Sequence, residues 1–318
     1  MDLLDTHVAS LTQLNVPETK RPDFDQFWAD TLQRVATTPL DISSTPVTYP
    51  VRAMDVHDVT FRALDGTPVK AWVILPAARS GRVPAIVHYH GAGGSRGIPA
   101  SYAHWTAMGL AVVVMDFRMQ AGLTGSHTGF VAHRSLGWMA MGLTDKHQFY
   151  LYHVWCDALC ALRLAREHAA IDPARIAVDG GSQGGGTALA MAALDQSVAL
   201  CTADVPSACW MEKRIFDRSG GASHIAQFIQ DHPDLLDTVM ATVSYCDNLN
   251  LAARITCPVL VSCGLKDPVC PPDTVYAAYN KIKAPKEMVA YPFAEHGGGG
   301  WLHTERKLAF VQQHFALA

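Results

Sequence analysis

Apolar runs of strand length alternate with helix-like segments over most of the chain. Residues 150–170 carry apolar side chains at helical spacing, and Pro173 interrupts this pattern before the next run. Strands that are apolar throughout are buried on both faces, which is typical of a mostly parallel, twisted sheet with helices on both faces. The sequence therefore predicts an α/β fold. The expected strands are residues 85–89, 111–115, 176–179, 198–201, 259–262 and 288–291.

The segment before these strands has two different patterns. Residues 22–35 have the spacing of an amphipathic helix with an aromatic face. Residues 59–64 and 69–75 have the pattern of an antiparallel hairpin that turns at Asp65-Gly66. We expect residues 1–50 to form a helical N-terminal extension, with the hairpin leading into the sheet.

Two segments interrupt the alternation further along. Residues 122–147 are rich in glycine, histidine and aromatic residues, and residues 210–250 have a mostly helical pattern. Inserts at the carboxyl ends of strands are where α/β folds form their pockets. No internal repeat or linker is visible, so the sequence predicts a single domain over residues 1–318, with both inserts shaping its pocket.

Charge and composition exclude several classes of partner. The 318 residues are 49% hydrophobic and 17% charged, and the formal net charge is -4. Such a chain has no basic field for nucleic acid or an anionic membrane surface. The N-terminus lacks the pattern of a signal peptide, and the apolar runs are too short to cross a bilayer. We expect a cytoplasmic protein with no nucleic-acid or membrane partner.

The eight cysteines have no metal-binding or redox spacing. No Cys-x-x-Cys pair occurs, and the cysteines lie in apolar contexts without the dense framework of a small secreted domain. We expect buried free thiols.

The candidate nucleophile is Ser182. Gly180-Gly-Ser-Gln-Gly184 matches the G-x-S-x-G nucleophile elbow and lies between an expected strand and an expected helix. The tight turn of this motif exposes the serine hydroxyl and requires glycines beside it. This context predicts the α/β-hydrolase fold, and a plain glycine turn is the alternative.

Two downstream residues complete a candidate triad in the chain order Ser, Asp, His. Asp267 follows the expected strand 259–262, and His296 follows the expected last strand, directly before four glycines. We assign His296 as the general base and Asp267 as the carboxylate that orients its ring. Alone, Asp267 is equally consistent with an aspartate that caps a turn before proline.

The loop after the expected strand 85–89 is the candidate oxyanion loop. His90-Gly-Ala-Gly-Gly94 resembles the His-Gly loop of esterases, and we assign the donors to the backbone N–H groups of Ala92 and Gln183. A competing interpretation takes His88 and His90 as metal ligands of a metallohydrolase. Since no pattern of carboxylate partners or His-Glu-x-x-His helix accompanies them, we expect neither a metal nor a cofactor.

Taken together, these motifs resemble the acetyl xylan esterase and cephalosporin C deacetylase family of carbohydrate esterases. The resemblance covers nearly the whole chain and is strongest at the elbow. The matching pieces are residues 23–28, 90–94, 116–120, 180–186, 204–206, 265–267, 270–272, 275–280 and 285–287.

The resemblance also implies roles for further residues. The Arg-Gly-Gln element of the family corresponds to Arg118-Met-Gln120, which implies that Arg118 and Gln120 support the active-site loops structurally. Ala92 stands where the family usually has an aromatic residue, and Gly297 where it usually has glutamate. Pro206 matches a position that lines the acyl pocket. We also expect Gly91, Trp105 and Trp210 at the substrate pocket, the two tryptophans as rings that could fill the space beside Ala92.

The resemblance implies a serine esterase that deacetylates small acetylated sugars, xylo-oligosaccharides and esters such as cephalosporin C through an acyl-enzyme on Ser182. It also implies a cytoplasmic homo-oligomer, a hexamer built as a trimer of dimers. Two alternatives stay open: a serine peptidase like the prolyl oligopeptidases, and a non-catalytic binding protein of hydrolase fold. The chain has none of the propeller repeats that accompany such peptidases. A non-catalytic protein of this fold would normally have lost a residue of the triad, and none is missing here.

Overall fold

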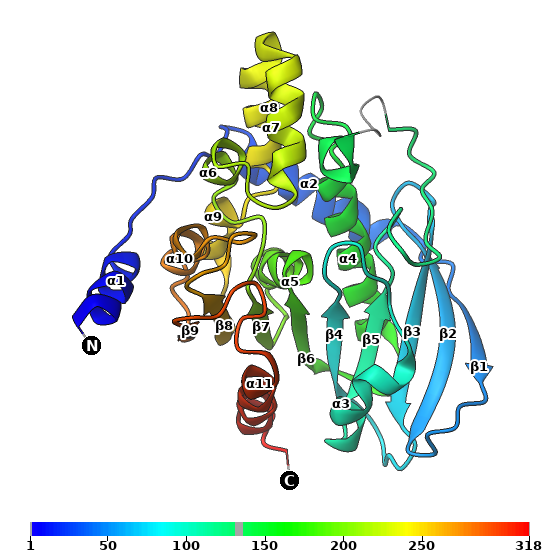
Figure 1. Ribbon diagram of the computed structural model, residues 1–318. Helices are drawn as coiled ribbons and strands as arrows, with labels where there is room; N and C mark the ends of the chain where they lie inside the picture. The colour runs from blue at the N-terminus through cyan, green and yellow to red at the C-terminus, as the bar shows by residue number, and fades with distance from the viewer. Residues whose placement is uncertain (1, 131–135, 318) are drawn as a thin grey trace.

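A nine-stranded mixed sheet forms the centre of the molecule. The computed structural model describes residues 2–130 and 136–317, and the strand order is β1-β2-β3-β5-β4-β6-β7-β8-β9 (Figure 1). Every pair from β5 to β9 is parallel, whereas β1, β2 and β3 join by antiparallel pairs. The strands are β1 (Ser43–Val47), β2 (Met54–Arg62), β3 (Pro68–Pro76), β4 (Val83–Tyr89), β5 (Ala111–Met115), β6 (Ile171–Gly181), β7 (Leu200–Asp204), β8 (Val259–Gly264) and β9 (Lys286–Tyr291).

The apolar strands are buried because each face of the sheet packs against its own hydrophobic core. In β5, Ala111, Val113 and Met115 belong to one core, and the alternating Val112 and Val114 belong to the other. Successive side chains of a strand point to opposite faces, so a strand covered on both faces must be apolar at every position. The predicted α/β-hydrolase architecture is confirmed.

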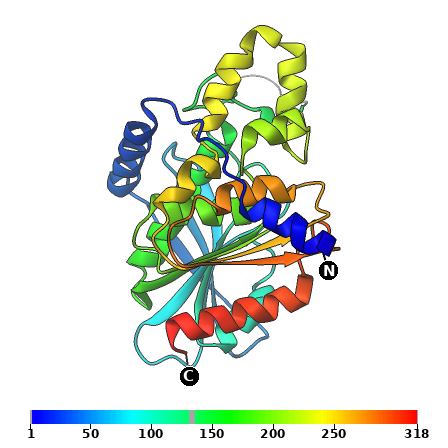
Figure 2. The ribbon, with the colours of Figure 1, turned by 90° about the vertical axis from the view of Figure 1, so that its left-hand side faces the viewer.

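Two sets of helices supply these cores (Figures 1 and 2). The larger core packs against α2 (Phe24–Thr37), α4 (Tyr150–Glu167), α5 (Gln183–Leu194) and α10 (Pro272–Tyr279). The smaller core, on the opposite face, packs against α3 (Ala103–Ala107), which follows η1 (Pro99–Tyr102), and α11 (Gly300–Phe315). The first helix, α1 (Asp2–Thr12), lies beside α10, where the Asn280 side chain donates to the backbone oxygens of Leu11 and Leu14.

The N-terminal region differs in one respect from the expected helical extension. The predicted helix over residues 22–35 is α2, and the predicted hairpin is the β2–β3 pair. Residues 43–47, however, form β1, which extends the sheet by pairing with β2. The sequence did not predict this strand because its side chains are mostly exposed, so it carries no apolar pattern.

The insert over residues 210–250 is helical, as predicted. It contains α6 (Met211–Phe216), α7 (Ala222–Asp231), η4 (Pro233–Leu235), α8 (Leu236–Ser244) and α9 (Asn248–Leu251), followed by η5 (Ala252–Arg254). In the insert over 122–147, the described part contains η3 (Trp138–Ala140) and turns, while residues 131–135 lie outside the described residues. Figure 1 places α7 and α8 together at one end of the molecule, next to the described part of the other insert.

Two further expectations concern the cysteines and the possibility of membrane-spanning helices. All eight cysteines are free and buried, as the sequence predicted. Among the helices described, none is long and apolar enough to cross a membrane.

Candidate active site

Ser182 lies on a strained turn between β6 and α5. Its backbone has φ 58° and ψ -116°, a conformation that L-residues rarely adopt. A hydrogen bond from the Ser182 N–H to the backbone oxygen of Asp204 (2.8 Å) fixes this turn to β7. A Cβ atom on Gly184 would lie 1.9 Å from the backbone oxygen of Tyr89, so only glycine allows α5 to start this close to β4. The predicted strand-turn-helix context of the elbow is confirmed.

His296 connects Ser182 to Asp267. Its Nε2 lies 2.8 Å from Oγ of Ser182, and its Nδ1 lies 2.8 Å from Oδ2 of Asp267. The carboxylate is an acceptor, so the Nδ1–H donates to Asp267, and Nε2 is left to accept the serine proton. The three side chains predicted from the sequence therefore meet with the geometry of a Ser-His-Asp triad.

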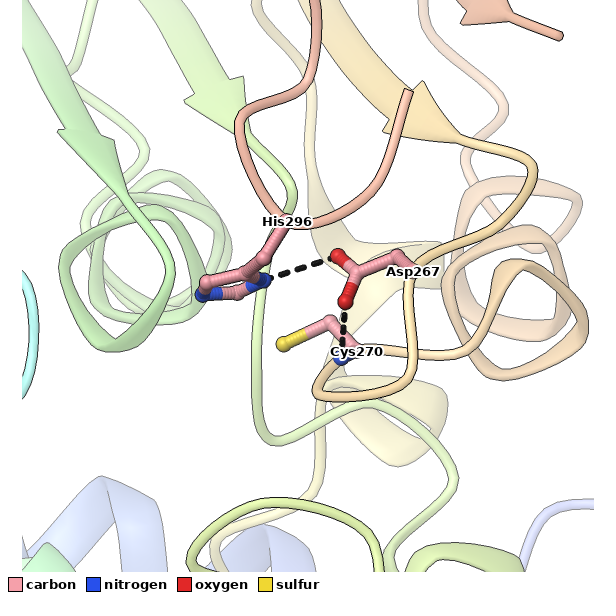
Figure 3. Close-up of side chains that lie close together, drawn as sticks. All are labelled: Asp267, Cys270 and His296. Atoms are coloured by element: carbon pink, nitrogen blue, oxygen red, sulfur yellow. Dashed lines mark hydrogen bonds and ion pairs between the residues drawn. The ribbon is translucent and has the colours of Figure 1, made fainter. Parts of the chain in front are cut away.

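Asp267 is held by its own loop. Its Oδ1 accepts the backbone N–H groups of Val269 (2.8 Å) and Cys270 (2.9 Å), while Oδ2 faces His296 (Figure 3). Because both oxygens are occupied, the carboxylate cannot turn away from the imidazole. A Cβ atom on Gly264 would lie 2.2 Å from the backbone oxygen of Glu295, so a glycine at the end of β8 lets the loops of Asp267 and His296 approach each other.

Cys270 lies beside the triad and was not predicted there. Its Sγ and the ligand atoms of Asp267 and His296 all lie within 4.8 Å of one another (Figure 3). Burial raises the pKa of the Cys270 thiol to about 11, so the thiol is protonated at neutral pH and does not compete with Ser182 as a nucleophile. A metal at this cluster would have to displace the hydrogen bonds that already occupy His296 and Asp267.

The structure gives His88 and His90 partners other than a shared metal. Nδ1 of His90 contacts the backbone oxygen of Gly91 (2.7 Å), and Nε2 accepts the backbone N–H of Phe117 (2.9 Å), so the ring connects the candidate oxyanion loop to the segment that follows β5. His88 Nδ1 contacts the buried carboxylate of Asp179 at 2.6 Å. The group of candidate metal ligands found in the described ranges includes neither histidine.

The two expected oxyanion donors flank Ser182 in one cavity. Gln183 is the first residue of α5, so its N–H is among the first four of the helix and has no intrahelical acceptor. Ala92 lies on the loop after β4, and both residues line a cavity of about 260 Å³ together with Ser182. The arrangement can present two N–H groups to a carbonyl oxygen at Ser182.

Gln120 connects the loop after β4 to the start of α5. Its Oε1 accepts the N–H of Gly93 (2.8 Å), and its Nε2 donates to Oε1 of Gln183 (3.0 Å) and to the hydroxyl of Tyr150 (3.0 Å). Arg118 supports the same loop, since its backbone oxygen accepts the Tyr150 hydroxyl (2.6 Å).

The guanidinium of Arg118 is fully buried between two carboxylates. It donates to both oxygens of Asp157 (2.6 and 2.7 Å) and to Asp65 (2.7 and 3.2 Å). Burial opposes the charge of Asp65, but the hydrogen bonds and charge of Arg118 hold the pKa of that carboxyl well below its usual range. The support that the resemblance implied thus has visible partners, of which Asp65 lies in the predicted hairpin turn and Asp157 in α4.

The expected pocket residues lie in four different surroundings. Gly91 is next to Ser182, since a Cβ on it would lie 4.0 Å from the serine Cβ, and Pro206 packs against Gly185 at the start of α5. Trp105 is 1% exposed and belongs to the core on the α3 and α11 face, and Trp210 packs against the cluster of Val16, Leu249 and Ala277. Neither tryptophan lines the cavity beside Ser182, because both rings pack in hydrophobic clusters instead, and Gly91 and Pro206 are not among its lining residues either.

The cavity is lined instead by residues that the sequence did not single out. Trp138 lies against the candidate oxyanion loop, since a Cβ on Gly93 would lie 4.0 Å from its ring. The only available signal was that many of these residues fall in the two predicted inserts. Besides the residues already named, the lining contains Met139, Leu151, Ser207, Ala208, Met211, Arg214, Gly220, Gly221, Ala222, His224 and Val269.

Comparison with known proteins supplies the family. The family model for acetyl xylan esterase (AXE1) matches residues 1–314. Acetyl esterase Axe7A from Xylanibacter ruminicola is 30% identical over 294 residues, which are 89% of this chain and 65% of that protein, so the chain spans about two thirds of the length of this relative.

Two solved structures are similar over nearly their full length. Acetyl xylan esterase from Paenibacillus sp. R4 has a TM-score of 0.91 and 32% identity, with 96% of this chain and 98% of that chain covered. Acetyl xylan esterase 1 from Thermoanaerobacterium sp. JW/SL YS485 has a TM-score of 0.90 and 26% identity at the same coverage. The chain belongs to the acetyl xylan esterase family, a family of carboxylic ester hydrolases.

Proposed function

We propose that the protein is a serine esterase that removes acetyl groups from small acetylated sugars and xylo-oligosaccharides, and from related acetyl esters such as cephalosporin C. The observation that carries the proposal is the hydrogen-bonded series Ser182–His296–Asp267, whose serine lines a cavity of about 260 Å³. Membership of the acetyl xylan esterase family supports the choice of acetyl as the acyl group.

The proposed reaction has two steps. His296 Nε2 takes the proton of Ser182 as Oγ forms a bond to the acetyl carbonyl carbon, and the N–H groups of Ala92 and Gln183 stabilise the oxyanion. His296 then protonates the leaving sugar oxygen, and an acetyl-enzyme remains on Ser182. Water attacks this ester with the same base, which releases acetate and restores the serine. Asp267 keeps its negative charge throughout and stabilises the imidazolium.

A substrate panel tests this proposal. Acetate release from acetylated xylo-oligosaccharides and cephalosporin C is measured beside hydrolysis of p-nitrophenyl acetate and of an aminoacyl-p-nitroanilide. We expect turnover of the acetyl esters and none of the anilide. Cleavage of the anilide at a comparable rate would favour the peptidase alternative, and hydrolysis of none of them would favour the non-catalytic one.

We also propose a single domain and, from the family resemblance, a cytoplasmic homohexamer that admits small substrates. Light scattering combined with deacetylation of polymeric xylan tests the assembly. A monomer in solution, or rapid deacetylation of the polymer, would contradict it.

A further inference from the structure

One cationic side chain on the cavity wall is buried with a backbone oxygen, and no carboxylate, as its printed hydrogen-bond partner among the described residues. Arg214 lies in α6, its side chain faces the cavity beside Ser182, and the residue is only 4% exposed. Arginine is rarely buried this deeply unless a carboxylate pairs with it, because removing its charge from water is costly.

The partners of Arg214 leave most of its donors unused. Nη2 donates to the backbone oxygen of Val269 (2.8 Å), whereas the buried Nε has no partner. Across residues 2–130 and 136–317, no carboxylate forms an ion pair with this guanidinium. One backbone oxygen therefore serves a group with five N–H donors.

Asp247 is a nearby carboxylate whose pKa is affected by the charge of Arg214, but its oxygens already accept backbone hydrogen bonds. It is fully buried, Oδ2 accepts the N–H of Met211 (2.7 Å), and Oδ1 accepts the N–H of Leu249 (2.9 Å). Burial raises the pKa of Asp247 to about 6, although its backbone hydrogen bonds and Arg214 act in the opposite direction. Asp247 therefore caps α9 rather than contacting Arg214.

The remainder of the wall offers no negative charge. Its lining consists of apolar side chains, glycines, Ser207, Gln183 and His224, whose buried Nδ1 also lacks a partner. Asp267, the carboxylate of the candidate triad, is not part of the lining, and both of its oxygens are occupied. A negatively charged group that enters this cavity would meet the guanidinium of Arg214 and no carboxylate among the lining residues.

We propose that Arg214 forms an anion subsite inside the catalytic cavity and binds a carboxylate carried by the alcohol portion of the ester. This inference rests on the proposed deacetylation: since an acetyl group has no room for a second charge, the carboxylate must belong to the group that leaves. The substrate class is then an acetylated acidic saccharide, in which a uronic acid lies next to the acetylated hydroxyl. Charge-assisted hydrogen bonds to a guanidinium are strong enough to give about a tenfold to hundredfold preference.

A matched pair of esters tests the subsite. 3-Acetoxybenzoate and 3-acetoxybenzamide have nearly the same shape and differ in charge, and each kcat/KM is divided by the rate of uncatalysed hydrolysis in the same buffer. We expect the wild type to prefer the carboxylate by about tenfold to hundredfold. Arg214→Gln should remove this preference, and Arg214→Lys should keep part of it. Arg218→Gln, an exposed arginine in the same insert, is the matched control and should keep the preference.

Several outcomes would overturn the proposal. Equal corrected rates for the two esters in the wild type would show that no anion is bound, and a proportional loss for both esters in Arg214→Gln would show that Arg214 has only a structural role. A preference seen instead between mono-p-nitrophenyl succinate and its succinamate analogue would put the charge on the acyl side. If Arg214→Gln does not fold, the inhibition constants of benzoate and benzamide are compared on the wild type. Stronger competitive inhibition by benzoate supports the subsite, and equal inhibition refutes it. Failure of the esterase proposal is separate, because the wild type would then hydrolyse neither ester.

Discussion

Nε2 of Gln120 donates a hydrogen bond to Oε1 of Gln183 at 3.0 Å, and this contact links the loop after β5 to the residue that follows the candidate nucleophile. Through its Oε1, the same amide holds the N–H of Gly93, next to Ala92. One side chain thus contacts both segments that carry the candidate oxyanion donors, although these segments are about 90 residues apart in the sequence. This pair of contacts requires an amide side chain, because only an amide can accept a hydrogen bond through its oxygen and donate one through its nitrogen.

Replacing this amide by a carboxylate tests the link. Gln120→Glu can still accept from Gly93 but cannot donate to Gln183, and it adds a negative charge near the developing oxyanion. We expect kcat for p-nitrophenyl acetate to fall about tenfold to hundredfold with a smaller change in KM. The control is Gln312→Glu, an exposed change in α11. Unchanged kcat in Gln120→Glu would contradict this positioning role.

Removing the candidate nucleophile gives the most direct test of the triad. Ser182→Ala should lower ester hydrolysis by more than about a thousandfold, because losing a triad member typically costs on the order of a million-fold. The thermal midpoint should stay nearly the same, as in the exposed control Ser101→Ala. Turnover assays and thermal unfolding together check this, and a larger residual activity would rule out Ser182 as the nucleophile.

The activity should depend on pH but not on metal. The rate is expected to rise with pH, since the reaction needs a Nε2 on His296 that is free to accept the proton of Ser182. A chelator should leave the profile unchanged. The measurement is kcat/KM against pH with and without EDTA. Loss of activity in EDTA that zinc restores would instead support a metal at His88 and His90.

The acyl range should depend on Ala92. A methyl group leaves space where the family usually has an aromatic ring, so propionyl and butyryl esters should be hydrolysed nearly as efficiently as acetyl esters. Ala92→Tyr should restore a preference for acetyl. Steady-state kinetics on a series of p-nitrophenyl esters would measure both.

Trp138 provides the control for this prediction, because its ring lies beside the same loop. If that ring already narrows the acyl pocket, the wild type will show a sharp fall beyond acetyl. Trp138→Ala will then widen the range while Ala92→Tyr changes little, and the role given to Ala92 is wrong.

His153 should contribute to instability in acid. The residue is 8% exposed, and burial, together with the charge of Arg118, lowers the pKa of His153 to about 4. In the unfolded chain the ring takes up a proton near pH 6.5. Between pH 6.5 and pH 4 the unfolded state therefore binds more protons, and the free energy of unfolding falls as the pH is lowered, by at most about 3 kcal/mol.

His153→Phe tests this by removing the titrating group while keeping a ring next to Phe130. Urea unfolding at pH 7, 5.5 and 4.5 should show a smaller loss of stability towards acid in the variant than in the wild type. Parallel curves for the two proteins would mean that His153 does not account for the acid sensitivity.

The sequence by itself determined the elements whose cause is local. The glycines around Ser182 reveal the elbow because the tight turn has steric requirements that neighbouring residues in the chain must meet. Asp267 and His296 could be predicted because parallel strands bring their carboxyl ends to one edge, so loops after successive strands meet there. The doubly buried strands were predictable for a similar reason, since burial on both faces demands apolar residues at every position.

Only the tertiary structure decided what surrounds these residues. Trp105 and Trp210 are apolar enough for a pocket, yet each packs in a hydrophobic cluster, and a sequence pattern does not say which cluster recruits a ring. β1 joins the sheet although its side chains are mostly exposed, because backbone hydrogen bonds to β2 do not depend on an apolar pattern. The unpaired state of Arg214 is set by the positions of Val269, Asp247 and the cavity wall, which lie on separate elements. The burial of a ring and the pairing of a charged side chain depend on contacts between distant parts of the chain, so both are determined only once the chain has folded.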